Sequence, residues 1–149
     1  MIDKQNQALF AKYGVFVGKE MDSRYEVFKE EYERKILIEG KIALKIARES
    51  IEPVVSEQLL NLAKTLKTAH EAGITAGTAA LAKNATRLGE EYECLDAEID
   101  SLAQAVEEND MAEIVDAMAR LRNVVDALEC SVDDAKWPLP KYREMLFIY

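Results

Sequence analysis

Few side chains in this sequence could do acid–base or metal chemistry, and their spacing does not suit it. The only histidine is His70, and Lys67 stands three positions before it. A di-iron site in a helical bundle needs Glu-x-x-His pairs on facing helices, which this chain lacks. A Ser-His-Asp arrangement would also have to use His70, without a nucleophile elbow. We therefore interpret His70 as a surface residue near a helix end.

The cysteines and glycines indicate no site either. Cys94 and Cys130 are the two cysteines, too few for a disulfide framework, and we expect two reduced thiols, each on a helix. No further ligands stand at the spacing of a zinc site. Gly73, Gly77 and Gly89 do not follow a phosphate-binding pattern. The sequence thus predicts no catalytic, cofactor-binding or metal-binding residue in this chain.

The acidic clusters are interpreted as solvated helix faces, and they comprise Glu30, Glu31, Glu33, Glu90, Glu91 and Glu93. Asp133 and Asp134 are expected to end the last helix, which is the unfavourable end for negative charge. A lysine or arginine from another element would relieve this misfit. Arg122 and Asp126 are spaced for a weak i, i+4 pair on the same helix.

Composition limits the classes of partner. The chain has 149 residues and a net charge of −9, with its basic residues interspersed among acids. A nucleic-acid surface needs clustered lysines and arginines, and an anionic membrane would repel this chain. No apolar run approaches the roughly 20 residues of a membrane helix, and the start lacks the apolar segment of a signal peptide. We expect a soluble, cytoplasmic protein.

The elements that would position these residues read as helices. A short helix is predicted over 4–13, ending near Gly14, followed by a link over 15–19 with Gly18 at its turn. A long helix is predicted over 20–50, with Gly40 packed closely against a neighbouring helix. Its apolar face comprises Tyr25, Phe28, Tyr32, Ile36, Gly40, Ala43 and Ala47.

Pro53 is expected to end or kink this long helix. The alternative is that Ser50 starts a new helix with Pro53 in its first turn. Either way, an apolar stripe continues through Val54, Leu59, Leu62, Ala63, Leu66 and Ala69. Gly73 is the expected C-terminal cap, and 73–77 forms a link to the next helix.

Two heptad patterns follow. The first comprises Leu81, Ala85, Leu88, Tyr92, Leu95, Ile99, Leu102 and Val106. The second comprises Met111, Ile114, Met118, Leu121, Val125, Leu128 and Val132. Asp110 with Glu113 resembles a capping box at the start of the second. Because so short a turn separates them, these two helices are expected to pack antiparallel.

The fold class predicted is all-α. We expect an elongated antiparallel bundle of about four long helices plus a short N-terminal helix, forming one domain over 1–149. A proline- and aromatic-rich tail over 137–149 follows it. Pro138 and Pro140 remove two backbone donors, so no regular helix can form until after Pro140. So much aromatic surface at a chain end must dock on something.

The tail carries a resemblance to the C-terminal end of type III glutamine synthetases. The matching residues are Leu121-Arg122, Val125-Asp126-Ala127-Leu128-Glu129, Val132-Asp133-Asp134 and Trp137-Pro138-Leu139-Pro140-Lys141-Tyr142-Arg143-Glu144-Met145-Leu146-Phe147. Nearer the N-terminus they are Leu9-Phe10, Tyr13-Gly14-Val15, Glu20, Ser23-Arg24-Tyr25-Glu26, Glu30, Tyr32, Ile38-Glu39 and Ile51-Glu52-Pro53. The resemblance spans almost the whole chain, weakly in the middle heptad helix, and the tail motif is its specific part.

The resemblance implies that this chain is the C-terminal helical domain of a larger enzyme that joins ammonia to glutamate. The resemblance also implies that the parent enzyme uses ATP and Mg or Mn, and that its subunits assemble into a double ring built from hexamers. The catalytic sheet would lie upstream, so Met1 would be an introduced start. The residues expected to dock on the parent are Trp137, Pro138, Pro140, Tyr142, Met145, Leu146 and Phe147.

Two hypotheses follow. In the first, the chain is a non-catalytic structural or oligomerisation domain of glutamine synthetase, in contact with the upstream catalytic domain and other subunits. In the second, it is an independent helical module that binds partner proteins through its heptad positions, without enzyme activity. A third reading, a bundle metalloprotein, is disfavoured by the single His70.

Overall fold

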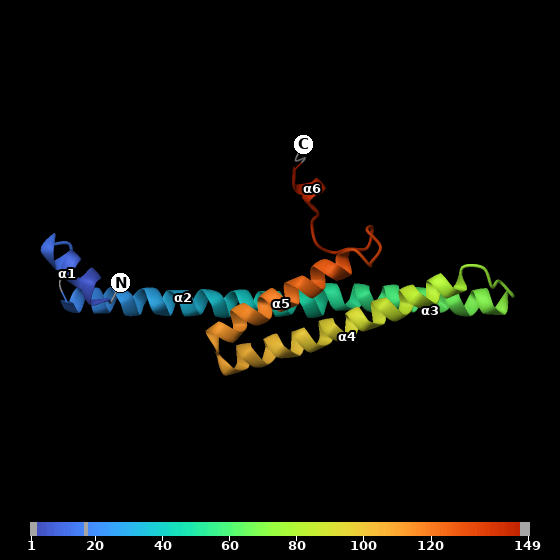
Figure 1. The fold of residues 1–149 in the computed structure, drawn as a ribbon, viewed down its shortest axis with the longest axis horizontal. Coiled ribbons are helices and arrows are strands. Elements are labelled where there is room, and N and C mark those ends of the chain that lie inside the picture. The colour runs from blue at the N-terminus through green and yellow to red at the C-terminus, as the bar shows by residue number, and fades with distance from the viewer. Residues whose placement is uncertain (1–2, 17, 147–149) are drawn as a thin grey trace. The chain divides into compact units, whose positions relative to one another are not determined.

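The computed structural model describes residues 3–16 and 18–146, apart from the side chains of Tyr142 and Arg143. This part of the chain is all-α, as predicted, and contains no strand. Its elements are α1 (Lys4–Lys12), α2 (Gly18–Ile46), the π-helical turn η1 (Ala47–Ile51), α3 (Glu52–Glu71), α4 (Thr78–Glu108), α5 (Met111–Glu129) and α6 (Tyr142–Leu146) (Figure 1). The chain divides into two compact units, 1–39 and 40–149, which are taken in turn.

In the first unit, α1 packs through aromatic contacts. The Asp3 side chain caps α1, and the helix gives way to Gly14 at φ 64°, near where the sequence predicted its end. The Phe10 and Phe16 rings meet edge to face with centroids 5.7 Å apart, and the Arg24 guanidinium lies 4.7 Å from the Phe16 centroid. Edge-to-face rings and a cation over a ring are both favourable, so these contacts hold the unit together.

The predicted link over 15–19 is wrong at its second half, because Gly18 is the first residue of α2 rather than a turn. The conformational cost of glycine applies to helix interiors, and it is smaller at the first helical position.

The predicted apolar face of α2 is only partly correct in this unit. Of the predicted residues, Ile36 is buried and Tyr25 is half-buried, but Phe28 and Tyr32 are 52% and 56% exposed. Met21, which the prediction omitted, is buried. The nine residues of α1 span only about 14 Å at 1.5 Å per residue. So short a helix cannot cover the whole apolar face of α2, and the two aromatic side chains remain open.

The predicted helix over 20–50 ends early, at Ile46, and η1 follows it. The Glu52 N–H donates to the Ala47 carbonyl, five residues back, and Pro53 then lies in the first turn of α3. Proline lacks an N–H and its ring clashes with the carbonyl four residues before it, so a wider turn relieves the conflict. Of the two predictions for Pro53, the one that placed it in the first turn of a new helix agrees better with the structure, although α3 begins at Glu52 rather than Ser50.

The wider turn also changes which residues face inward. Ala47, Ile51 and Val55, four residues apart, are buried, and Val55 is completely inaccessible. The predicted stripe omitted Val55, and one of its members, Ala63, is exposed. The remaining members of the stripe are half-buried.

The second unit turns back on itself at Gly73, as predicted. Gly73 has φ 70°, its N–H donates to the His70 carbonyl, and the Ile74 N–H donates to the Ala69 carbonyl at 2.9 Å. These two bonds form a Schellman motif, in which a left-handed residue closes the helix end. Helix α4 then begins at Thr78, so 73–77 is the link that was expected.

Helix α4 runs antiparallel to the chain from Gly40 onward. Leu102 and Val106 approach Gly40, Asp100 pairs with Arg48 at 3.6 Å, and the Tyr92 hydroxyl donates to Glu52 at 3.2 Å. A Cβ built on Gly40 would lie 2.8 Å from Ile114 Cγ2, which confirms the predicted close packing at this glycine.

Helices α4 and α5 form the predicted antiparallel hairpin (Figure 1). Both heptad sets face inward, each member being buried or half-buried. Asn109, at φ 56°, ends α4, and the Asp110 carboxylate accepts hydrogen bonds from the Ala112 and Glu113 N–H groups, both at 3.1 Å. Asp110 is thus the predicted cap, whereas the Glu113 side chain bonds Arg120 and does not complete a capping box.

Candidate functional site

The candidate site lies where the tail after α5 folds against the second unit. The sequence prediction that Asp133 and Asp134 end the last helix is wrong, because α5 stops at Glu129 and a turn follows. In that turn the Asp133 carboxylate accepts from the Ala135 N–H at 3.0 Å, which is a local alternative to continuing the helix.

Two lysines fasten the tail. Lys141 forms an ion pair with the Asp134 side chain and also donates to the Asp134 carbonyl. Asp134 thus has a cationic partner, although the helix end that was the reason to expect one is not there. Lys136 pairs with Glu57 of α3 at 2.6 Å. Its hydrogen bond and its charge hold the pKa of the Glu57 carboxyl below its usual value. The tail is therefore tied both to itself and to α3.

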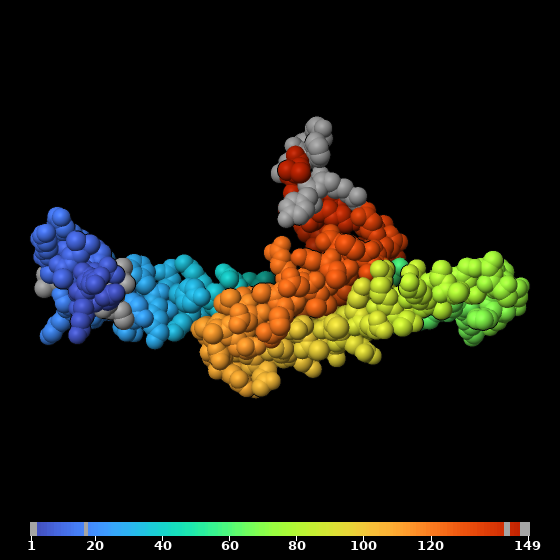
Figure 2. All heavy atoms as spheres, viewed as in Figure 1, coloured from blue at the N-terminus to red at the C-terminus, as the bar shows by residue number. Residues whose placement is uncertain are grey.

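Trp137 is buried by the chain itself, at 8% exposed. Its indole helps to enclose a cavity of about 380 Å³, which we call the tail pocket. The helices α2 and η1 contribute Ala43, Ile46, Ala47 and Ile51. Helix α5 contributes Met118, Leu121, Arg122, Val125, Asp126 and Glu129, and the tail contributes Trp137, Leu139, Pro140, Lys141 and Met145. Figure 2 shows the described tail residues (red) lying against α5 (orange).

The polar residues of the tail pocket are mostly paired. Arg122 lies 3.6 Å from Asp126, which confirms the predicted i, i+4 pair, and Lys141 pairs with Asp134. Glu129 is exposed, and no cation of the described part of the chain pairs with it. Among the charged lining residues that the structure describes, Glu129 is thus the one without an opposite partner, and it lies beside an apolar interior.

The residues predicted to dock are separated by the structure. Trp137, Pro140 and Met145 come together at the tail pocket. Pro138 is exposed and Leu146 is 75% exposed, and neither lines it. Phe147 and the side chain of Tyr142 lie outside the described residues. Sequence reasoning did not foresee the contribution of Ala43 or of η1, because no local pattern reports packing between segments so far apart.

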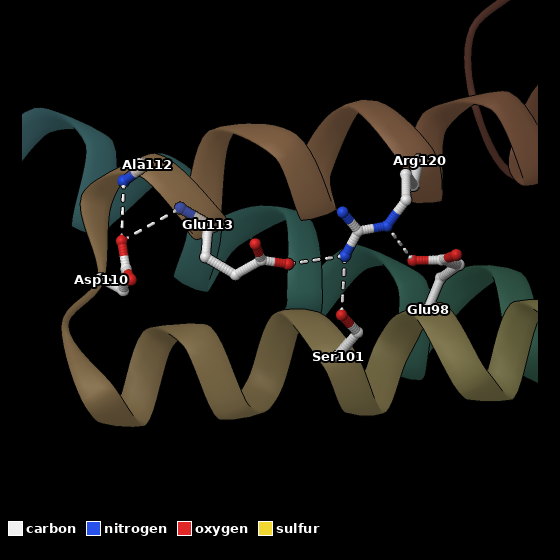
Figure 3. A network of polar contacts seen from close by, with 6 residues as sticks. All are labelled: Glu98, Ser101, Asp110, Ala112, Glu113 and Arg120. Atoms are coloured by element: carbon white, nitrogen blue, oxygen red, sulfur yellow. Dashed lines mark hydrogen bonds and ion pairs between the residues drawn. The ribbon is translucent and has the colours of Figure 1, made fainter.

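A second polar cluster joins α4 to α5. Arg120 donates to Glu98 at 2.9 Å, to Ser101 at 2.8 Å and to Glu113 at 2.8 Å (Figure 3). The hydrogen bond to Glu113, followed by the one to Glu98, raises the pKa of the Arg120 guanidinium. Every charged group in the cluster has an opposite partner, so we assign it to holding the hairpin register.

The remaining candidates for chemistry are dispersed. His70 is exposed in the last turn of α3, as predicted. Cys94 is exposed on α4, while Cys130 is exposed just beyond α5 rather than on a helix. Glu91 departs from the predicted solvated face, because one of its carboxylate oxygens is buried without a hydrogen bond. Within residues 3–16 and 18–146, no three histidine, cysteine or acidic residues gather as metal ligands.

The fold and the site together define an all-α helical module with an apolar pocket under its C-terminal tail. Residues 1–70 match the family model of the glutamine synthetase C-terminal domain. The chain is also similar to a glutamine synthetase of Bacteroides fragilis (strain YCH46), with 27% identity over 179 residues, covering 97% of this chain and 22% of that protein. It thus spans about a fifth of the length of the curated relative it matches.

No solved structure matches the chain. Among the helices that the structure describes, none is long and apolar enough to cross a membrane.

Proposed function

We propose that this chain is a non-catalytic, C-terminal helical part of a glutamine synthetase, and that it contributes to the architecture of the enzyme's subunit. The observation that carries the proposal is the match of residues 1–70 to the C-terminal domain of that enzyme. The similarity to the Bacteroides fragilis glutamine synthetase over 97% of the chain supports it. The tail motif over 137–147 supports the finer assignment to the type III enzymes.

In this proposal the chemistry belongs to the rest of the parent enzyme, which would ligate ammonia to glutamate with ATP and Mg or Mn in the cytoplasm. The helical part would contact the upstream catalytic domain and other subunits of a homo-oligomer, such as a double hexameric ring. The close helix packing at Gly40 and the hydrogen-bonded Arg120 cluster fix the helices against one another, which suits a domain with a structural role.

The test has two measurements. The 149-residue chain, supplied with glutamate, ammonia, ATP and Mg²⁺, is expected to form glutamine no faster than a blank. The native protein, isolated from its cells with antibody to this chain, is expected to be several times heavier than 16.8 kDa. Turnover by the chain, or a native polypeptide of about its own mass, would contradict the proposal.

A second candidate is an independent helical module that binds partner proteins without enzyme activity. One observation favours it, because the family match stops at residue 70 and leaves the α4–α5 hairpin outside. The mass of the native polypeptide separates the two candidates.

A further inference from the structure

We propose that the tail pocket receives one large apolar side chain from a polypeptide segment outside this chain, and that a lysine or arginine stands beside that side chain. The inference rests on the proposed function, since the segment would belong to the remainder of the parent enzyme. Its basis is the size, the lining and the charge of the tail pocket.

Size and lining specify the apolar part of the partner. A cavity of about 380 Å³ is at the lower end of the range of small-ligand pockets, so it has room for one aromatic or large aliphatic side chain. Its walls include Ile51, Leu121 and Trp137, all buried, so the interior is set by packed residues. Apolar anchors that fill such pockets contribute most to protein interfaces.

The rim of the pocket is open and carries apolar side chains beside the charged ones. Ile46 and Met145, which both line it, are 38% and 50% exposed. An inserted side chain would remove this surface from water, at about 25 cal/mol for each Å² of apolar area.

The charged residues of the pocket lining indicate which residue should stand beside the inserted apolar side chain. Arg122 and Lys141 already pair with acids, at Asp126 and Asp134, whereas Glu129 has no cationic partner in the described part of the chain. A lysine or arginine beside the anchor would supply one. The whole chain carries a net charge of −9, which also favours the approach of a basic segment.

The segment that enters the pocket would come from the part of the parent enzyme that lies outside this chain. This chain covers only 22% of the Bacteroides fragilis glutamine synthetase, so most of such an enzyme would lie outside it. A segment of that remainder would be present at one copy for every tail pocket. Its tether to the chain would raise its effective concentration, so a weak contact would suffice.

The test uses Trp137, which is the only tryptophan of the chain and lines the pocket, as a fluorescent reporter. Three blocked pentapeptides serve as probes: Gly-Lys-Phe-Lys-Gly, Gly-Lys-Ala-Lys-Gly and Gly-Glu-Phe-Glu-Gly. The first should shift the Trp137 emission in a saturable way, and the other two should bind about tenfold more weakly or worse.

Two variants assign the binding to the pocket. Glu129→Lys should weaken binding of the Lys-Phe-Lys peptide about tenfold, whereas Glu93→Lys, the same charge change at an exposed site away from the pocket, should not. Ala43→Met should weaken binding by occupying part of the cavity. The melting temperature of each variant, read by circular dichroism, separates a filled or recharged pocket from an unfolded chain.

Equal binding of all three peptides, or no saturable binding of the first, would overturn the inference. Trp137 emission that changes with protein concentration alone, together with a dimer in sedimentation, would assign the pocket to a second copy and also overturn it. The proposed function is judged separately by the native mass. A heavy native enzyme with no peptide binding removes only the pocket inference. Peptide binding by a native 16.8 kDa protein removes the parent enzyme and, with it, the proposed source of the segment, but leaves the pocket's preference for an apolar side chain beside a cation.

Discussion

Gly40 of α2 lies so close to Ile114 of α5 that a Cβ on the glycine would stand 2.8 Å from the isoleucine Cγ2. Gly40→Ala should therefore destabilise the chain by about 1–2 kcal/mol, because the cost of overpacking exceeds the gain in helix propensity. Urea denaturation followed by circular dichroism measures the change.

Gly89 is the matched control for that substitution. It also lies within a helix, but a Cβ there would meet nothing within 4 Å. Gly89→Ala should stabilise the chain by up to about 1 kcal/mol. If both substitutions stabilise to the same extent, the contact between α2 and α5 at Gly40 is not as tight as the structure has it.

Trp137 should behave as a residue of the folded interior rather than as free tail surface. It is 8% exposed, so Trp137→Ala should lower the free energy of unfolding by about 3 kcal/mol. Leu146→Ala, at a position 75% exposed on the same tail, should change it by less than about 0.5 kcal/mol. Equal melting temperatures for the Trp137→Ala variant and the parent chain would mean that the indole packs elsewhere.

Glu57 should make stability depend on pH in the acidic range. Lys136 holds the pKa of Glu57 below its usual value of 4.5, so the folded state favours the carboxylate. The resulting stability is present above pH 4.5 and is lost as the pH falls through the lowered pKa of the folded state.

The measurement for this pair compares the chain with its Glu57→Gln variant. The parent chain should be more stable near pH 7, and the difference should shrink steadily below pH 4.5. Because the Glu57 side chain is exposed and that of Lys136 is half-buried, added salt should reduce the difference near pH 7 as well. A difference that is independent of pH would exclude the ion pair as its cause.

The parts of this fold that the sequence predicts are those with a local cause. The heptad positions of α4 and α5 face inward because apolar side chains three and four residues apart share a helix face. Gly73 and Asp110 are identifiable caps because their conformations or side chains satisfy helix ends. Phe28 was misassigned because burial requires a second element, and no pattern within α2 reveals whether one is present.

The tail pocket shows the same limit at the candidate site. Trp137 and Pro140 stand out in the sequence as residues that must dock, but Ala43 and Val125, which line the same pocket, are ordinary members of helical faces. The π-helical turn before Pro53 adds a change of register that the spacing of apolar residues does not display. Contacts between distant segments therefore leave no local pattern in the sequence.

Asp110 is predicted to be the stabilising cap of α5. Its carboxylate accepts from two N–H groups that have no other partner within the helix, so Asp110→Ala should cost about 1 kcal/mol. Asp110→Asn keeps an acceptor oxygen and should cost much less. Chemical denaturation of both variants decides the matter, and equal losses would mean that the charge rather than the hydrogen bonds matters.

The Glu113 side chain could either complete a capping box with Asp110 or pair with Arg120. In a capping box its side chain would bond the backbone N–H of Asp110, whereas in the structure it accepts from Arg120 at 2.8 Å. A double-mutant cycle with Glu113→Ala and Arg120→Ala should therefore show a favourable coupling free energy that weakens in high salt. The cycle of Glu113→Ala with Asp110→Ala should be close to additive. The reverse pattern would restore the capping box and leave Arg120 bridging only Glu98 and Ser101 of α4.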